Sequence, residues 1–328
     1  MRPFRYERPD DAAAAVALLA VSPEGRYLGG GTNLVDLMRL GVEAPNLLVD
    51  ISGIVGHEID DRGDGGVTIG AGVTNSRLAA DPRVRRDYPV LSQALLNGAS
   101  GQLRNLATVG GNLLQRTRCA YFQDVSKPCN KRLPGTGCPA RTGEHRNLAV
   151  FGHSSQCVAT HPSDMAVALV ALDATVLVRG PGGERVVALT ELHRLPGDEP
   201  ERDTVLRPGE LITSIALAPS PVAANSVYRK VRERRSFAFA LVSVAAALQM
   251  RDGAVSEVRL AFGGVAHRPW RASVAEAALR GRPASEPAFA AALDAELERA
   301  QPLRQNAYKL PMLRRVAVRA LSELAEAQ

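Results

Sequence analysis

Tyr27-Leu28-Gly29-Gly30-Gly31-Thr32-Asn33-Leu34 places three glycines directly after a short predicted strand at Arg26–Leu28. Consecutive glycines allow the backbone to turn sharply and to aim successive N–H groups at one point, as phosphate-binding turns do. Thr32 and Asn33 add side-chain donors. The spacing is not G-x-G-x-x-G and we expect no βαβ unit after it, so a Rossmann fold is not favoured. A glycine run of this kind, met alone, is more often only a turn.

A second glycine motif strengthens the phosphate interpretation. Ala107-Thr108-Val109-Gly110-Gly111-Asn112-Leu113 repeats the combination of paired glycines, a hydroxyl residue and Asn about 80 residues later. Two such loops could hold a pyrophosphate from opposite sides. Between them, residues 47–51 and 67–73 predict strands, Thr74 is expected to open a helix, and 100–105 is expected to be a turn after a helix at 90–98.

The composition is that of a folded globular protein. The 328 residues are 45% hydrophobic and 23% charged, with a formal net charge of +6, and the length predicts two domains or three small ones. Basic residues are scattered and are not interleaved with aromatics, so nucleic-acid binding is not favoured. No run approaches the roughly 20 apolar residues of a membrane-spanning helix. The helix predicted at Pro9–Val21, with Asp10 and Asp11 before it, lacks the pattern of an export signal.

All four cysteines fall within 39 consecutive residues: Cys119, Cys129, Cys138 and Cys157. The segment around them is rich in Pro and Gly and buries little apolar surface, so something must hold it in one conformation. The spacing matches neither a zinc ribbon nor the ferredoxin run. Three interpretations stay open on spacing: a [4Fe–4S] cluster, a structural zinc, and disulfides or free thiols. Basic residues nearby would offset the charge of a thiolate cluster; they are Arg116, Arg118, Lys127, Lys131, Arg132 and Arg141.

Taken in order, the motifs resemble the FAD-binding subunit of the xanthine dehydrogenase/carbon monoxide dehydrogenase family. Besides the two glycine motifs, the resemblance rests on residues 68–74 (TIGAGVT), on Pro162-Ser163-Asp164 before an apolar helix, and on Tyr228-Arg229-Lys230. It covers essentially the whole chain. Most such subunits run directly from the second glycine motif to Pro-x-x-Asp, whereas this chain inserts its cysteine segment there. That departure resembles the medium subunit of periplasmic aromatic-aldehyde oxidoreductases, where the insertion holds a [4Fe–4S] cluster.

The resemblance implies a role for each motif. FAD would be bound at Tyr27, Leu28, Gly29, Gly30, Gly31, Thr32, Asn33, Leu34, Thr108, Gly110, Gly111 and Asn112. Within this set, Gly29–Asn33 and Thr108–Asn112 would hold its pyrophosphate through backbone N–H groups. Thr74 would open a helix at the flavin site, Asp164 would accept a hydrogen bond from the adenosine ribose, and the Lys230 charge would stabilise reduced flavin. The plainer alternatives are helix caps at Thr74 and Asp164 and a surface lysine at Lys230. Phe237 or Phe239 would cover the flavin ring or, alternatively, pack on the core as part of a strand. The cluster would be ligated by Cys119, Cys129, Cys138 and Cys157.

The implied fold is α+β: a two-subdomain FAD-binding fold of the PCMH/vanillyl-alcohol-oxidase type, followed by a C-terminal α/β domain of the CO dehydrogenase flavoprotein type. We expect an N-terminal subdomain at 1–55, a second at 56–222 with the iron–sulfur insertion at 115–160, and a C-terminal domain at 223–328. In the last of these, 236–250 and 255–263 predict antiparallel strands joined by a turn at Arg251-Asp252-Gly253. Helices are predicted at 272–279, 288–300 and 312–325.

The implied function is electron transfer within a heterotrimeric oxidoreductase. A large subunit would oxidise an aldehyde or heterocycle at a molybdenum cofactor, a small subunit would carry [2Fe–2S] clusters, and FAD in this chain would pass electrons to an external acceptor. No general base or nucleophile for substrate oxidation stands out. The alternatives are a stand-alone flavin-dependent oxidoreductase of the same fold and a zinc-stabilised adaptor without redox chemistry. We expect a cytoplasmic protein, or a periplasmic one co-exported with a signal-bearing partner.

Overall fold

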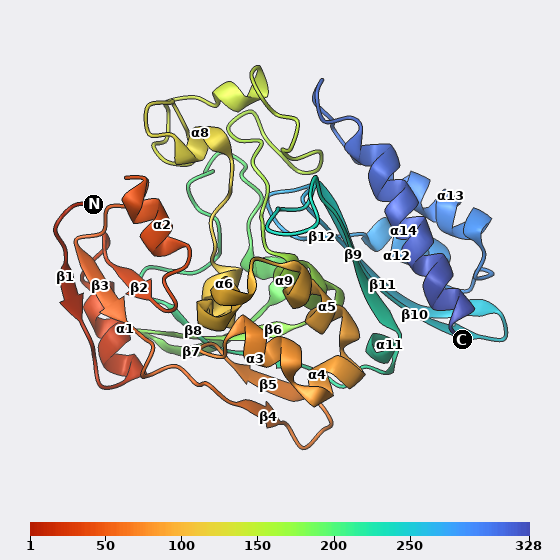
Figure 1. Cartoon of the computed structure of the whole chain (residues 1–328), viewed down its shortest axis with the longest axis horizontal. Helices are drawn as coiled ribbons and strands as arrows, with labels where there is room; N and C mark the ends of the chain where they lie inside the picture. The colour runs from red at the N-terminus through yellow and green to blue at the C-terminus, as the bar shows by residue number, and fades with distance from the viewer.

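A computed structural model describes residues 1–328 and contains three sheets (Figure 1). The N-terminal sheet is parallel, with strand order β1-β3-β2. Its elements are β1 (Arg5–Glu7), α1 (Ala12–Ala20), β2 (Arg26–Leu28), α2 (Leu34–Arg39) and β3 (Leu47–Asp50). β2, α2 and β3 form a βαβ unit around the first glycine run, so the expectation that no such unit follows the glycines is wrong. The strand has only three residues and the helix six, too few to show a periodic pattern.

The middle of the chain forms a five-stranded antiparallel sheet with order β4-β5-β8-β6-β7. Its strands are β4 (Ile59–Asp61), β5 (Val67–Gly70), β6 (Thr175–Gly180), β7 (Gly183–Ala188) and β8 (Leu211–Leu217). Its helices are α3 (Asn75–Ala80), α4 (Pro82–Asp87), α5 (Pro89–Asn97), α6 (Gly101–Leu106), α7 (Val109–Leu113), α9 (Asp164–Ala171) and α10 (Leu189–Leu192). α6 occupies the place where we expected a turn, because the Ser100 hydroxyl caps it by accepting a hydrogen bond from the N–H of Leu103 at 3.3 Å.

The C-terminal part is a four-stranded antiparallel sheet with order β12-β11-β10-β9, covered by helices. Its elements are α11 (Pro221–Ala224), β9 (Ser226–Val231), β10 (Val242–Arg251), β11 (Ala254–Gly263), β12 (Trp270–Arg271), α12 (Ser273–Leu279), α13 (Glu286–Leu297) and α14 (Lys309–Glu326). The predicted hairpin is confirmed: Asp252 and Gly253 have φ of 53° and 75°, as a tight turn between twisted strands requires. β10 begins at Val242 rather than at Ser236. α14 is the longest helix, and no helix is long and apolar enough to cross a membrane.

α9 is the central element of the molecule (Figure 1). All eight of its residues are buried, since it packs against α5 on one side and against β10 and β11 of the C-terminal sheet on another. Its sequence after the first residue is entirely apolar, as a helix enclosed on every side requires. The helix therefore fixes Asp164, its first residue, at the junction of the middle and C-terminal parts.

The cysteine segment between α7 and α9 has little regular structure. It contains only the short helix α8 (Ala120–Gln123) and a 3-10 turn at Pro139–Arg141. Figure 1 shows it as a separate lobe above the middle sheet, between α2 and the C-terminal helices. It has its own cluster of nine buried residues, three of them cysteines, and one of them Leu37 of α2. Its small core makes the segment depend on other contacts for its order.

Candidate functional site

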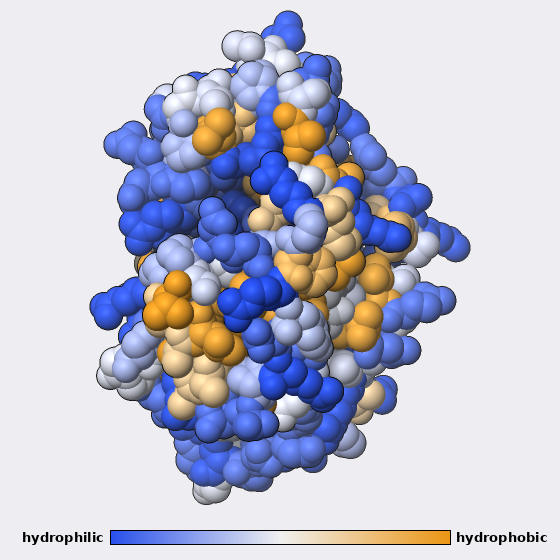
Figure 2. Space-filling model, turned by 90° about the vertical axis from the view of Figure 1, so that its left-hand side faces the viewer, coloured by the Kyte–Doolittle hydropathy of each residue, from blue (hydrophilic) through white to orange (hydrophobic).

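Two cavities meet at the glycine loops. One, which we call the Tyr27 cavity, has a volume of about 390 Å³; the other, the Lys230 cavity, has about 370 Å³. Thr32, Asn33 and Gly111 line both. The face that carries the N-terminal sheet is visibly hollowed, and hydrophilic residues line the hollow (Figure 2). An elongated ligand with one end in each cavity would have its middle at the glycine loops.

The two glycine motifs lie against each other because backbone contacts leave no space for side chains. A Cβ on Gly30 would stand 2.0 Å from the carbonyl oxygen of Leu106, and one on Gly29 would stand 3.1 Å from Oγ1 of Thr108. Gly31 has φ of +70°, which favours glycine. The second motif is the first turn of α7 rather than an extended loop, with the Thr108 hydroxyl accepting from the N–H of Gly111 at 3.2 Å.

Four side-chain atoms of residues that line these two cavities are buried without a hydrogen-bond partner: Nδ2 of Asn33, Oδ1 of Asn75, Nε of Arg118 and Oε2 of Glu201. Buried polar groups are nearly always paired, so these atoms indicate a missing ligand or water. Asn112, by contrast, is engaged within the protein, where its Oδ1 accepts from Oγ of Ser163 at 2.6 Å and from Gln115 at 2.8 Å. Thr74 caps α3, as expected, and its neighbour Asn75 lines the Lys230 cavity. Free donors, a glycine cradle and a cavity on each side fit a dinucleotide.

Asp164 and Lys230 form a buried ion pair, with 2.7 Å between Oδ2 and Nζ. Their side chains are 9% and 1% exposed, and Tyr228 donates to Oδ1 of Asp164 at 2.6 Å. Burial raises the pKa of Asp164, and the Lys230 ammonium opposes that rise. Ser163, not Asp164, caps α9 by accepting from the N–H of Ala166 at 3.0 Å. Both paired residues line the Lys230 cavity, so they cannot serve opposite ends of FAD.

Phe237 and Phe239 belong to the loop between β9 and β10, not to a strand on the core. Phe237 has φ of 50° and is 57% exposed, and Phe239 is 48% exposed. Both line the Lys230 cavity, and the guanidinium of Arg118 lies 5.1 Å from the centre of the Phe239 ring. The prediction of a strand from residue 236 is therefore wrong for residues 236–241, because the positive φ of Phe237 interrupts an extended backbone. The loop is placed to cover whatever occupies the cavity.

The four cysteines are free thiols that line one small, mostly apolar pocket, the cysteine pocket. Cys119, Cys129 and Cys157 are buried and Cys138 is partly exposed. A hydrogen bond from the Cys157 thiol lowers the pKa of Cys138 to about 6, and the same bond together with burial raises the pKa of Cys157. No group of three or more His, Cys, Asp or Glu side chains is arranged to hold a metal ion. The donor chemistry of four thiols fits an iron–sulfur cluster, but the structure shows no preformed ligand geometry.

Sequence motifs did not identify several charged residues of the Tyr27 cavity. Glu43, Asp203 and Glu210 line it together with Arg116, which sequence reasoning had connected only with the cysteines. Asp203 is 87 residues from its partner Arg116, so the contact exists only in the folded chain.

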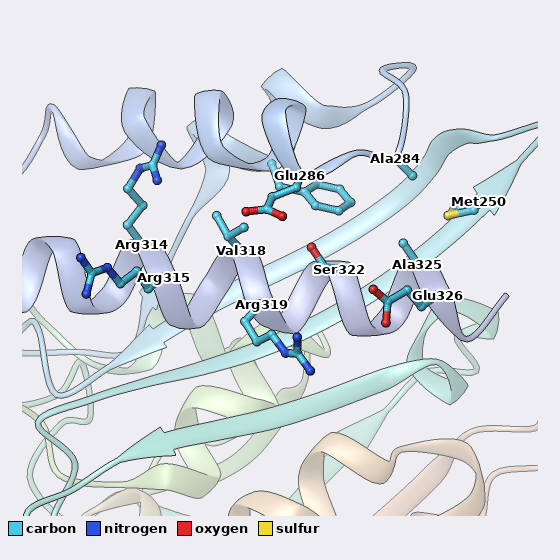
Figure 3. Close-up of a pocket in the computed structure, with 11 residues that line it drawn as sticks. Met250, Ala284, Glu286, Arg314, Arg315, Val318, Arg319, Ser322, Ala325 and Glu326 are labelled. Atoms are coloured by element: carbon cyan, nitrogen blue, oxygen red, sulfur yellow. The ribbon is translucent and has the colours of Figure 1, made fainter.

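Another cavity, of about 510 Å³, lies elsewhere, between α13 and α14 (Figure 3). Arg314, Arg315 and Arg319 leave α14 in different directions rather than converging on one point. Arg314 pairs with Asp294 and Arg319 pairs with Glu323. This cavity contains none of the glycines or cysteines, and it is not part of the candidate site.

Comparison with known proteins gives matches over nearly the whole chain. The family model of the FAD binding domain in molybdopterin dehydrogenase matches residues 2–220, and that of the CO dehydrogenase flavoprotein C-terminal domain matches residues 210–324. The aldehyde oxidoreductase FAD-binding subunit PaoB of Escherichia coli K12 is 50% identical over 324 residues, 98% of each chain. The carbon monoxide dehydrogenase medium chain of Afipia carboxidovorans is 27% identical over 87% of this chain and 83% of that one.

Solved structures of carbon monoxide dehydrogenases have the same fold over nearly the whole chain. Carbon monoxide dehydrogenase from Hydrogenophaga pseudoflava superposes with a TM-score of 0.76 at 27% identity, over 99% of this chain and 98% of that one. The expected two-part fold, an FAD-binding region followed by a CO dehydrogenase flavoprotein domain, is confirmed. The chain therefore belongs to the family of FAD-binding medium subunits of the molybdenum hydroxylases, which are oxidoreductases.

Proposed function

We propose that this chain is the FAD-binding, electron-transferring subunit of a molybdenum-containing aldehyde oxidoreductase and that its cysteine segment carries a [4Fe–4S] cluster. The observation that carries the proposal is the glycine cradle at the junction of two cavities, in a chain 50% identical to an aldehyde oxidoreductase FAD-binding subunit. Its partners would be a large subunit with the molybdenum cofactor and a small subunit with [2Fe–2S] clusters. We keep 1–55, 56–222 and 223–328 as the proposed domain limits.

FAD would lie with its pyrophosphate at the glycine loops. Backbone N–H groups of Gly29–Asn33 and of the first turn of α7 would bind the phosphate oxygens, and Nδ2 of Asn33 would gain its missing acceptor. When bound, FAD accepts electrons and passes them on singly or in pairs. We place the flavin ring in the Lys230 cavity, where Arg118, Phe237 and Phe239 would surround it and exclude water.

This placement changes the roles implied for Asp164 and Lys230. Since Asp164 neutralises Lys230 within the same cavity, the pair would act as a fixed dipole rather than as a free positive charge. The Arg118 guanidinium, paired only with the half-exposed Asp36 at 3.3 Å, is the cation that would face the flavin. Its position directly before Cys119 brings it close to the proposed cluster as well. Short separation between cofactors is what electron exchange requires.

The cluster proposal rests on the donor set. Four thiols with an apolar lining and Lys131 beside them fit a thiolate-bound iron–sulfur cluster. We expect the thiols to rearrange when iron enters, with the Cys138–Cys157 hydrogen bond replaced by bonds to iron.

An anaerobic experiment distinguishes a relay subunit from a stand-alone flavoenzyme. The isolated chain and its complex with both partner subunits are each mixed with an aromatic aldehyde while flavin absorption is followed. We expect the flavin to bleach in the complex only. Bleaching in the isolated chain at the rate of the complex would contradict the relay function.

We further propose that the chain folds and loads its cofactors in the cytoplasm and reaches the periplasm only with a signal-bearing partner. The proposal rests on the resemblance to periplasmic aldehyde oxidoreductases. Fractionation of cells with and without the small subunit tests it. Retention of the chain in the cytoplasm in both strains would contradict co-export.

A further inference from the structure

A line of ion pairs, buried at its two ends and partly exposed in the middle, connects the cysteine pocket with the Tyr27 cavity. It begins at Lys131, whose side chain is 1% exposed and lines the cysteine pocket. The Lys131 ammonium pairs with Oδ1 of Asp203 and also donates to the carbonyl oxygen of Pro200 at 2.6 Å. A lysine enclosed to this extent is held by its partners rather than by solvent.

From Asp203 the line continues into the other site. Oδ2 of Asp203 accepts from Nε of Arg116 at 2.9 Å, and Nη1 of Arg116 lies 2.5 Å from Oε1 of Glu43. Asp203, Arg116 and Glu43 all line the Tyr27 cavity. Burial alone would raise the pKa of Asp203, but the charges of Lys131 and Arg116 outweigh it and hold that pKa well below its usual range. The charges alternate in sign along the line, and at its far end Arg26 pairs with Oε2 of Glu43 at 3.3 Å.

Arg116 makes two further contacts that reach both sites. Its backbone N–H donates to Oδ1 of Asn33, in the first glycine run, at 2.9 Å. Its guanidinium lies 4.7 Å from the centre of the Phe122 ring, and Phe122 lines the cysteine pocket. One residue thus touches the glycine cradle, the Tyr27 cavity and a wall of the cysteine pocket.

Through these contacts, the stability of the cysteine pocket and that of the Tyr27 cavity depend on the same ion pairs. Because Lys131 is almost fully buried, removal of Asp203 would leave its charge uncompensated, and the partly exposed Arg116 would lose one of its two carboxylate partners. Lys131 is held in place by an irregular segment whose hydrophobic cluster has nine buried residues. Anything that orders this segment also fixes Lys131, and through Asp203 it fixes Arg116 at the edge of the glycine cradle.

We propose that this line of ion pairs couples metal occupancy of the cysteine pocket to FAD binding: the loaded segment positions Lys131, Asp203 and Arg116, and these preorganise the Tyr27 cavity. The inference rests on the proposed function, because it takes the cysteine segment to hold iron. Linkage makes the effect reciprocal, so bound FAD also favours retention of iron. Couplings between sites commonly lie between about 5-fold and 150-fold in affinity, and we expect about 10-fold here.

The test measures FAD affinity and iron content on the same samples of the full chain. Wild type is compared with and without iron, the latter after anaerobic chelation, and FAD dissociation is followed by recovery of flavin fluorescence. The same pair of measurements is made on Lys131→Met and on Asp203→Asn, which keeps the shape of the side chain. Lys127→Met, an exposed lysine of the same segment, is the control. Thermal unfolding of each variant verifies that it is folded.

We expect iron removal to weaken FAD binding about 10-fold in wild type and in Lys127→Met. In Lys131→Met and Asp203→Asn, FAD should bind weakly with or without iron, so that the effect of iron removal falls below about 2-fold. Suppose that purified wild type contains iron and that its FAD affinity is the same after chelation has removed this iron. The coupling is then wrong, while the proposed function stands. If wild type never contains iron, the cluster and the coupling are both wrong, and the iron assay identifies that case.

Discussion

The glycine cradle and the cysteine segment serve neighbouring sites but are built in opposite ways. The cradle is made of backbone: a βαβ unit, the capped helix α7, and close approaches such as Gly30 against Leu106. The cysteine segment is made of turns held by side chains, including the ion pairs of Lys131 and Arg116. A site fixed by backbone exists before its ligand arrives, whereas one fixed by side chains needs its metal to become complete. We therefore expect loss of iron to disorder the cysteine segment more than it weakens FAD binding.

The largest loss of cofactor is expected where the cradle leaves no space. Gly30→Val would place a Cβ 2.0 Å from the carbonyl oxygen of Leu106, and backbone cannot yield as a flexible side chain does. We expect FAD content to fall at least 10-fold and the free energy of unfolding to drop by about 1–3 kcal/mol or more. Gly182→Ala, whose Cβ would meet nothing within 4 Å, should change the free energy of unfolding by less than about 0.5 kcal/mol. Normal FAD content in Gly30→Val would show that the two motifs are not locked together.

Next in size is the loss of a proposed cluster ligand. Cys138→Ser should remove most of the iron and increase protease cleavage within 115–160, because the segment then lacks its metal. FAD should remain bound, with weaker affinity. Leu133→Ser, an exposed position in the same segment, is the control and should keep its iron. Full iron and unchanged protease resistance in Cys138→Ser would contradict the assignment of this thiol.

The buried pair in the Lys230 cavity allows a double-mutant test. Lys230→Met leaves Asp164 buried without its counter-ion, and Asp164→Asn leaves Lys230 without its own. Each single change should lower the free energy of unfolding by about 3–5 kcal/mol. The double variant should be clearly less destabilised than the sum of the single changes, as denaturant unfolding will show. Additive effects would mean that the two charges do not interact. Asp164 could then bind the ribose and Lys230 the flavin independently.

The most gradual effect concerns Lys309, which ties the cysteine segment to the C-terminal part. Its buried ammonium donates to the carbonyl oxygens of Leu148 at 3.0 Å and Gly264 at 2.7 Å. Burial lowers the pKa of Lys309 to about 7 from the ordinary 10.5. Between pH 7 and pH 10.5 the Lys309 side chain is protonated in the unfolded chain and neutral in the folded chain. The free energy of unfolding should therefore rise with pH in this range, by at most about 1.4 kcal/mol per pH unit.

Lys309→Met should abolish this part of the pH dependence, while the exposed Lys127→Met should retain it. Urea unfolding at several pH values above neutrality measures the slope. Equal slopes in wild type and Lys309→Met would show that Lys309 keeps its proton throughout this range.

The sequence predicts the regular parts of the molecule better than the site. The hairpin at Asp252-Gly253, the three C-terminal helices and the glycine motifs follow from turn chemistry and periodicity. Ser163 and Asp164 are both good caps, and sequence alone did not tell which of them the chain uses. Asp203 lies 72 positions from its partner Lys131 and 87 positions from its partner Arg116, so no local sequence pattern reveals these ion pairs.

The most direct test of the central claim is one anaerobic sample of the purified chain, with its absorption spectrum and its flavin, iron and zinc contents. We expect flavin bands over a broad iron–sulfur shoulder, with about four irons for each FAD. Flavin together with zinc and no iron would preserve the cradle and contradict the cluster. A folded, colourless protein that takes up no added FAD would contradict the account itself.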